Sequence, residues 1–190
     1  LCWHRKNFNV NSTLLQLTVA RYLPICPKEN IIIVTNAGYK GLVKEQLPDL
    51  RDEQILLEPS RKNTAPCIAY AAYKINEENK DANIIVAPSD HLIIKEVDFQ
   101  NTIKKAINKA ESENCLLTIG IKPSRPDTGY GYIQFEDDNN SDESIKKVQT
   151  FTEKPLFDLA KSFIESGDFY WNSGMFIWNV KSLLAAFETH

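Results

Sequence analysis

Short runs of apolar, β-branched residues alternate along this chain with segments that are apolar on one face only. The runs cover residues 31–34, 55–57, 84–87 and 116–121, and Leu1 with Cys2 resembles the end of another. Polar residues bound each run, which is typical of a strand covered on both faces. The alternation therefore predicts βαβ units in a three-layer α/β fold with a mostly parallel, Rossmann-like sheet.

Capping signals indicate where several helices begin and end. Thr13 and Gln16 have the spacing of a capping box, and the helix that they open stops at Pro24. Thr64 is a candidate cap for a later helix, with Pro66 tolerated in its first turn. A helix over residues 156–166 is expected to end at Gly167.

The alternation stops after residue 128. The segments GYGYIQF and IKKVQTFTEKP predict two strands around the acidic loop EDDNNSDES. That loop lacks the DxDxDG pattern, so it indicates a solvated surface loop rather than a calcium site. The apolar residues 175–180 predict another strand, and residues 172–174 are expected to form the loop that enters it. A last helix is expected to begin near Ser182.

Composition and charge exclude several classes of function. A chain of 190 residues with 43% hydrophobic and 25% charged residues fits one soluble domain. The net charge of -3, with scattered basic residues, argues against a nucleic-acid partner. No apolar run approaches the roughly 20 residues that span a bilayer, and no signal peptide is recognisable, so we expect no membrane partner and a cytoplasmic location.

The cysteines do not indicate a metal site. All 4 lie far apart, without a CxxC pair or a neighbouring histidine. This spacing predicts neither a zinc site nor a disulfide framework. We interpret them as small, buried apolar residues.

Candidate chemistry begins at Asp90, which directly follows the run 84–87 in the sequence PSDH. Ligands of open α/β sheets bind outside the carboxyl ends of the strands, so a carboxylate in this place is a functional candidate. The alternative is that Asp90 caps the next turn. The loop 58–66 precedes a helix whose free N–H groups and dipole suit an anionic ligand, with an ordinary capped loop as the alternative.

Several stretches, in one order along the chain, resemble the mannose-1-phosphate guanylyltransferases, a family of nucleotide-sugar-forming nucleotidyltransferases. They are EPSRKNTAPCIAYAA (58–72), VAPSDHLI (86–93), IGIKPSRPDTGYGYI (119–133), FTEKP (151–155) and WNSGMFIW (171–178). The resemblance implies the nucleotide-diphospho-sugar transferase fold and transfer of GMP from GTP to mannose 1-phosphate. The products would be GDP-mannose and pyrophosphate, and the cofactor would be Mg²⁺. A homo-oligomer is possible within this family, and the resemblance leaves the oligomeric state open.

The resemblance also implies roles for individual residues. Asp90 would bind the metal and act in catalysis together with Lys154, which would hold the sugar phosphate. Glu153 would accept hydrogen bonds from sugar hydroxyls, and Gly131 and Asn172 would line the sugar pocket. The residues implied to bind the nucleotide are Arg61, Asn63, Thr64, Ala65, Pro66, Ser89 and Asp90.

One departure from the family pattern concerns the phosphate loop. The family has a glycine-rich loop, roughly GGxGxRLWP, between an opening strand and a tryptophan that resembles Trp3, but no glycine precedes Gly38 here. A second metal-binding aspartate of the family would lie beyond residue 190. We therefore expect residues 1–190 to form a single, incomplete nucleotidyltransferase domain, with the glycine-rich loop missing near residues 2–3 and the C-terminal part missing after residue 190. The activity of this domain would depend on the missing parts.

Two other functions stay open on this sequence. One is uridylyl or thymidylyl transfer to glucose 1-phosphate, since the choice of base rests on the resemblance alone. The other is a non-catalytic module that binds nucleotide sugars, which the missing loop and second aspartate favour. The PSDH, EKP and WNSG motifs favour an enzyme.

Overall fold

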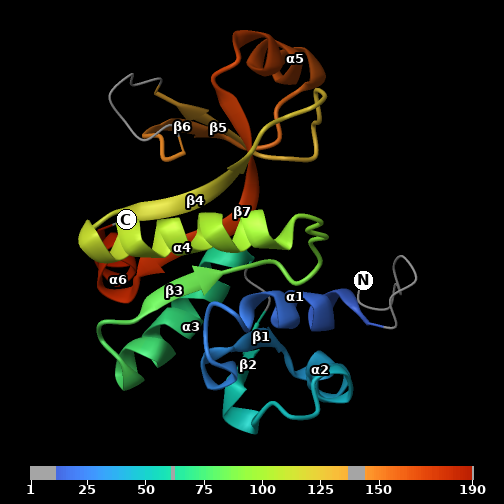
Figure 1. The fold of residues 1–190 in the computed structure, drawn as a ribbon, viewed down its shortest axis with the longest axis vertical. Helices are drawn as coiled ribbons and strands as arrows, with labels where there is room; N and C mark the ends of the chain where they lie inside the picture. The colour runs from blue at the N-terminus through green and yellow to red at the C-terminus, as the bar shows by residue number, and fades with distance from the viewer. Residues whose placement is uncertain (1–11, 61–62, 137–143, 190) are drawn as a thin grey trace. The chain divides into compact units, whose positions relative to one another are not determined.

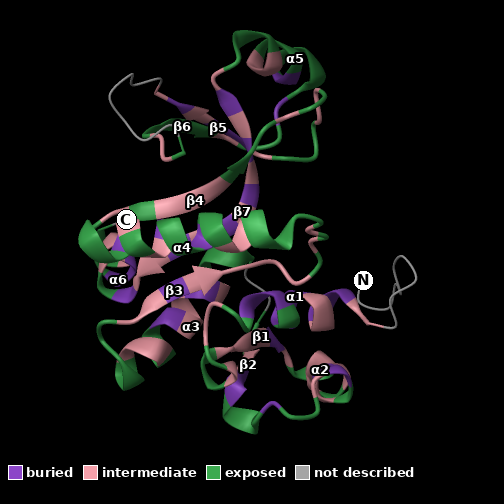
Figure 2. Cartoon of the chain, in the orientation of Figure 1, coloured by how far each residue is buried: buried purple, intermediate pink, exposed green. Residues whose placement is uncertain are grey.

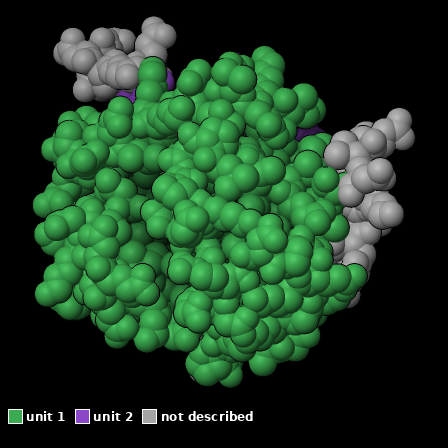
Figure 3. Space-filling view, turned by 60° about the horizontal axis from the view of Figure 1, so that its bottom comes forward, with its two compact units in different colours: residues 1–117, 176–190 green, residues 118–175 purple. Residues whose placement is uncertain are grey.

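The computed structural model describes residues 12–60, 63–136 and 144–189. The expectations for Leu1, Cys2, Trp3 and Arg61, and for most of the acidic loop, lie outside the described residues. The chain divides into two compact units, residues 1–117 with 176–190 and residues 118–175 (Figure 3). Helices and strands alternate through most of the chain (Figure 1), which confirms the α/β class.

The first unit contains most of the regular structure. Its helices are α1 (Leu14–Tyr22), α2 (Lys40–Gln46), α3 (Thr64–Glu78), α4 (Glu96–Ser112) and α6 (Val180–Thr189), with short 3₁₀ turns at Lys28–Asn30, Ala37–Tyr39 and Asp52–Gln54. Its strands are β1 (Ile33–Asn36), β2 (Ile55–Glu58) and β3 (Asn83–Val86). The second unit holds β5 (Tyr132–Phe135), β6 (Val148–Thr152) and α5 (Phe157–Ser166). Strands β4 (Leu116–Ile121) and β7 (Phe169–Asn179) have residues in both units.

Strand direction corrects the expectation of a mostly parallel sheet. Strands β1 and β2 pair in parallel, in the register Ile33↔Ile55. Strand β7 pairs antiparallel with β3 and also with β5, which is itself antiparallel to β6. The apolar runs predicted strands correctly, but most of their residues are half-buried and several of β4 are exposed, so the expected cover on both faces is wrong. An apolar run also does not encode the direction of its neighbour.

Apolar clusters of described residues pack the helices of the first unit against its strands. One joins α3, α6 and β3, with Ala72 and Val180 fully buried. The other joins α1, α2 and β2 through Leu15, Val43 and Ile55. Figure 2 shows purple, buried segments on the helices and strands of both clusters. The second unit has its own core of Tyr132, Ala160, Phe169 and Trp171.

A cavity of about 450 Å³ lies in the first unit, lined by residues 31–34 and 83–87 and by side chains of α1 and α3. Among the described strands, β1 pairs only with β2, and β3 only with β7. Natural edge strands usually carry charged residues or proline, but IIIVTN and NIIVA contain neither. Two strands with the composition of sheet centres therefore border this cavity without a described partner on that side.

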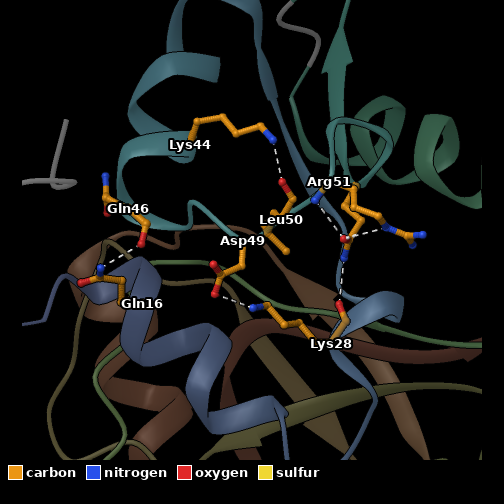
Figure 4. Close-up of polar contacts among 8 residues, drawn as sticks. Gln16, Lys28, Lys44, Gln46, Asp49, Leu50 and Arg51 are labelled. Carbon is orange, nitrogen blue, oxygen red and sulfur yellow. Dashed lines mark hydrogen bonds and ion pairs between the residues drawn. The ribbon is translucent and has the colours of Figure 1, made fainter.

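Polar side chains hold the connection between α2 and β2 (Figure 4). The Gln54 amide donates to the carbonyls of Lys28 and Ile31, each at 2.8 Å. Lys44 Nζ donates to the Leu50 carbonyl at 2.6 Å, and Gln16 Nε2 donates to the Gln46 carbonyl at 2.8 Å. These bonds fasten the irregular segments that enter β1 and β2.

Several local predictions are confirmed, and others are wrong. The capping box at Thr13 and Gln16 is present, and Gly167 ends α5 in the left-handed region with φ 82°. Helix α3 begins at Thr64, so its N-cap is Asn63 rather than Thr64. Residues 172–174 lie within the 11-residue strand β7 instead of a loop, and α6 begins at Val180 rather than Ser182. Strand β5 pairs with residues 169–171, directly before this segment, and Gly174 within it keeps a turn-like φ of 72°.

Two further expectations concern the cysteines and the membrane. Cys26, Cys67 and Cys115 are free and half-buried, so the prediction of full burial is wrong for these three, while Cys2 is outside the described residues. Partial burial raises the pKa of each of the three thiols.

Within the described residues, each helix is too short or too polar to cross a membrane.

Candidate functional site

Asp90 lies in the loop that leaves β3, and its side chain is exposed. It makes no hydrogen bond or ion pair with any other described residue. No group of three or more histidine, cysteine or acidic side chains that could hold a metal occurs in the described parts of the chain. A single open carboxylate still fits Mg²⁺, which commonly keeps several waters and binds substrate phosphates together with one or two carboxylates.

Residues Asn63, Thr64, Ala65 and Pro66 form the exposed start of α3. Asn63 has φ 66° and ψ -164°, a region that costs non-glycine residues on the order of 1–3 kcal/mol. Its side chain makes no capping hydrogen bond, so no described side chain satisfies the first N–H groups of this 15-residue helix. The helix start thus presents N–H groups without a described side-chain partner, together with the positive end of its dipole.

Three of the predicted sugar-site residues meet in the second unit. A Cβ atom added to Gly131 would lie 2.9 Å from Glu153 Oε2 and 3.6 Å from Asn172 Cβ. The Asn172 N–H also donates to the Gly131 carbonyl at 2.8 Å. Strands β5, β6 and β7 therefore bring together residues that are far apart in the chain, and the glycine leaves room beside the Glu153 carboxylate.

The side-chain oxygen of Asn172 lies beside the Gly174 N–H and beside Thr118, a residue that the sequence did not single out. Asn172 Oδ1 accepts a hydrogen bond from the Gly174 N–H at 3.1 Å. The Thr118 hydroxyl, which has one proton to donate, lies 3.1 Å from the Met175 carbonyl and 3.3 Å from Asn172 Oδ1. With its oxygen occupied, the amide presents its NH₂ group as the donor for a ligand. Thr118 stands in an ordinary apolar strand, and only the strand pairing reveals its role.

Lys154 follows β6 in a strained conformation. Its φ of 39° lies in the left-handed region, which non-glycine residues seldom adopt. Its Nζ lies 3.3 Å from Glu153 Oε1, and the two side chains are 62% and 72% exposed. Exposed pairs contribute only about 0–1 kcal/mol, so this pair does not explain the strain. Strained residues cluster at functional sites, which supports the candidacy of Lys154.

Hydrogen bonds also hold the loop that leads to Gly131. The buried Tyr132 hydroxyl donates to the Asp127 carbonyl and accepts from the Asp127 N–H, both at 3.0 Å. The Gly129 N–H donates to Asp127 Oδ1 at 2.9 Å, and Arg125 pairs with Oδ2 at 2.6 Å. These donors, Gly129 first, hold the pKa of Asp127 below its usual range. The backbone near Gly131 is therefore ordered before a ligand arrives.

The comparisons with known proteins define the class of this chain. The family model described as nucleotidyl transferase matches residues 5–189, so the chain belongs to the nucleotidyl transferase family. It is 42% identical over 179 residues to the Mannose-1-phosphate guanylyltransferase of Escherichia coli. The aligned residues cover 90% of this chain and 38% of that protein. It is 38% identical over 182 residues to the Alginate biosynthesis protein AlgA of Pseudomonas aeruginosa, covering 95% of this chain and 37% of AlgA. The chain thus spans less than half the length of these relatives.

Two solved structures share the fold. A mannose-6-phosphate isomerase from Helicobacter pylori superposes with a TM-score of 0.84 at 34% identity, over 100% of this chain and 70% of that one. A protein from Thermus thermophilus, described as a mannose-1-phosphate geranyltransferase, has a TM-score of 0.84 at 25% identity, over 94% of this chain and 51% of that one. The α/β fold is therefore shared across nearly the full chain.

The bonds to Asp127 predict a dependence of stability on acid pH. Because the folded-state pKa is lowered, the ionised carboxylate stabilises the protein above the pKa of the unfolded state, about 3.9. This contribution is lost as the pH falls through the lower folded-state pKa. The free energy of unfolding, measured in urea between pH 6 and pH 2, should fall less steeply for Asp127→Asn than for the wild type below about pH 4. Identical slopes would contradict the assignment.

Proposed function

We propose that this chain is the nucleotidyltransferase part of a mannose-1-phosphate guanylyltransferase, which transfers GMP from GTP to mannose 1-phosphate and forms GDP-mannose and pyrophosphate. The observation that carries the proposal is the meeting of Gly131, Glu153 and Asn172 around one small space. The names of the relatives support the choice of substrates, since the Escherichia coli protein is a mannose-1-phosphate guanylyltransferase.

The sugar side would act by binding and orientation. A phosphate oxygen of mannose 1-phosphate attacks the α-phosphorus of GTP, and the bond from that phosphorus to the bridging oxygen of the β-phosphate breaks. The Lys154 ammonium would bind the sugar phosphate. The Glu153 carboxylate would accept hydrogen bonds from sugar hydroxyls, and the Asn172 amide would donate to another. Fixing the attacking group in this way removes much of the entropic barrier.

The nucleotide side would use the start of α3 and the loop after β3. Arg61 and residues 63–66 would contact guanine and ribose, and Ser89 would border the nucleotide beside Asp90. Asp90 would hold Mg²⁺, which, when bound, neutralises charge on the triphosphate. The open Asp90 carboxylate and the uncapped helix start support these roles.

We extend the proposal to the domain itself. Residues 1–190 would form one incomplete nucleotidyltransferase domain, and a strand from outside the described residues would occupy the cavity between β1 and β3. Such a strand would pair with both open edges and join β1, β2 and β3 into one layer of a three-layer fold. The apolar composition of both edges supports this completion. The cytoplasmic location and the oligomeric state stay predictions.

Asp90→Ala tests the catalytic role. Because the carboxylate is exposed and makes no described contact, we expect the variant to fold with unchanged stability. Turnover of GTP and mannose 1-phosphate should fall by at least about 100-fold, since the metal loses one of its protein ligands. Asp98→Ala, which removes an exposed carboxylate from the first turn of α4, is the control and should stay active. An unchanged rate for Asp90→Ala would remove Asp90 from the mechanism. If the wild-type protein bound GDP-mannose without any turnover, the alternative of a non-catalytic binding module would be favoured.

A competition assay tests the choice of base and sugar. The protein is offered GTP, UTP and dTTP together, first with mannose 1-phosphate and then with glucose 1-phosphate, and the nucleotide sugars are separated by chromatography. We expect GDP-mannose as the main product. A main product that contains uridine or thymidine would overturn the assignment in favour of uridylyl or thymidylyl transfer.

The intact mass of the protein purified from its source tests the completion of the domain. We expect a mass clearly above the 21.7 kDa of these residues, because a further strand, the phosphate loop and a second metal-binding carboxylate would all be present. A mass of 21.7 kDa would contradict the proposed completion. We would then expect at most nucleotide or sugar binding.

A further inference from the structure

Two buried polar side chains of α1 hold the loop that carries Asp90. Thr18 and Arg21 are only 7% and 3% exposed, and they are three positions apart, so they lie on one face of the helix. The Thr18 hydroxyl donates to the Ser89 carbonyl at 3.3 Å. Arg21 Nη2 donates to the His91 carbonyl at 3.4 Å. The two acceptors are the carbonyls of the residues directly before and after Asp90.

Packing alone does not explain the burial of Arg21. Its Nε has no hydrogen-bond partner among the described residues, and the carboxylate of Glu96, at 3.8 Å, belongs to a side chain that is 51% exposed. The Phe99 ring lies 5.9 Å from the guanidinium carbon. Burial also lowers the pKa of Arg21 despite the opposing effect of Glu96. A buried, weakly paired cation costs stability relative to an apolar side chain of similar volume, so its presence indicates a task that needs the donor.

We propose that Thr18 and Arg21 are positioning residues that orient the Asp90 carboxylate toward the metal and the nucleotide phosphates. This inference rests on the proposed function, in which Asp90 is the metal ligand. Asp90 has no described side-chain partner of its own, so the backbone on either side of it sets the direction of its carboxylate. A displacement of about 1 Å in a reacting group lowers rates by about 100-fold. Fixing both neighbouring carbonyls prevents such a displacement.

The first test measures backbone order parameters by NMR relaxation in the metal-free protein with its full natural sequence. Thr18→Val keeps the side-chain volume and removes the donor, and Arg21→Gln removes the charge. In both variants we expect the order parameters of residues 89–92 to fall below about 0.6, the range of a flexible loop, because the loop loses a hydrogen bond to α1. The control Thr102→Val removes a hydroxyl that donates to the Asp98 carbonyl within α4, and it should leave the loop unchanged. Wild-type order parameters at residues 89–92 in both Thr18→Val and Arg21→Gln would overturn the proposal.

The second test measures turnover in the protein purified with its full natural sequence, as a function of Mg²⁺ concentration. We expect the Mg²⁺ concentration for half-maximal rate to rise about tenfold in Thr18→Val and in Arg21→Gln, with partial rescue in Arg21→Lys. A merely structural role would lower the amount of folded protein without shifting this concentration. If Arg21→Gln does not fold, Thr18→Val and Arg21→Lys decide the outcome through the shift in the Mg²⁺ concentration for half-maximal rate.

Asp90→Ala, measured in the same series, separates the two ideas. An active Asp90→Ala would refute the proposed metal role, and the positioning inference would fall with it. An inactive Asp90→Ala, together with a wild-type Mg²⁺ dependence in Thr18→Val and Arg21→Lys, would refute the positioning inference alone. An inactive Asp90→Ala with a shifted Mg²⁺ dependence in the two variants would support both.

Discussion

Hydrogen bonds from buried side chains to the main chain hold the loop that carries Asp90 and the loop that leads to Gly131. In the first unit, Thr18 and Arg21 bond to the carbonyls on either side of Asp90. In the second unit, the buried Tyr132 hydroxyl bonds to both main-chain groups of Asp127, and so orders the approach to Gly131. A loop beyond a strand has no ladder of its own, so its geometry depends on such donors from the core. The candidate side chains Asp90, Glu153 and Lys154 themselves stay exposed.

The proposed sugar site combines space with strain. Gly131 leaves a place where any side chain would meet Glu153, and Lys154 adopts a backbone conformation that is costly for lysine. Neither feature stabilises the fold, and an exposed ion pair between Glu153 and Lys154 offsets little of the cost. The surrounding strands therefore maintain a local arrangement that is unfavourable by itself, which is the physical pattern of a binding site.

The cavity between β1 and β3 connects stability with function. Both strands have the apolar composition of a sheet centre, and each has one edge without a described partner. The chain also spans only 37% to 38% of the length of two relatives that it resembles. A strand that closed this cavity would bury apolar surface and satisfy two rows of backbone groups at once. It would also lie beside α1, the helix that holds the Asp90 loop.

The sequence by itself determined the local features of this protein: where most helices and strands occur, the capping box at Thr13, the glycine that ends α5, and the placement of Asp90 in the loop after an apolar strand. These depend on residues within a few positions of one another. Only the tertiary structure decided the direction of β7 against its neighbours, the meeting of Gly131, Glu153 and Asn172, and the bonds from α1 to the Asp90 loop. Each of these joins segments that are far apart in the chain, and the periodicity of one segment carries no information about which partner, register or direction another will supply.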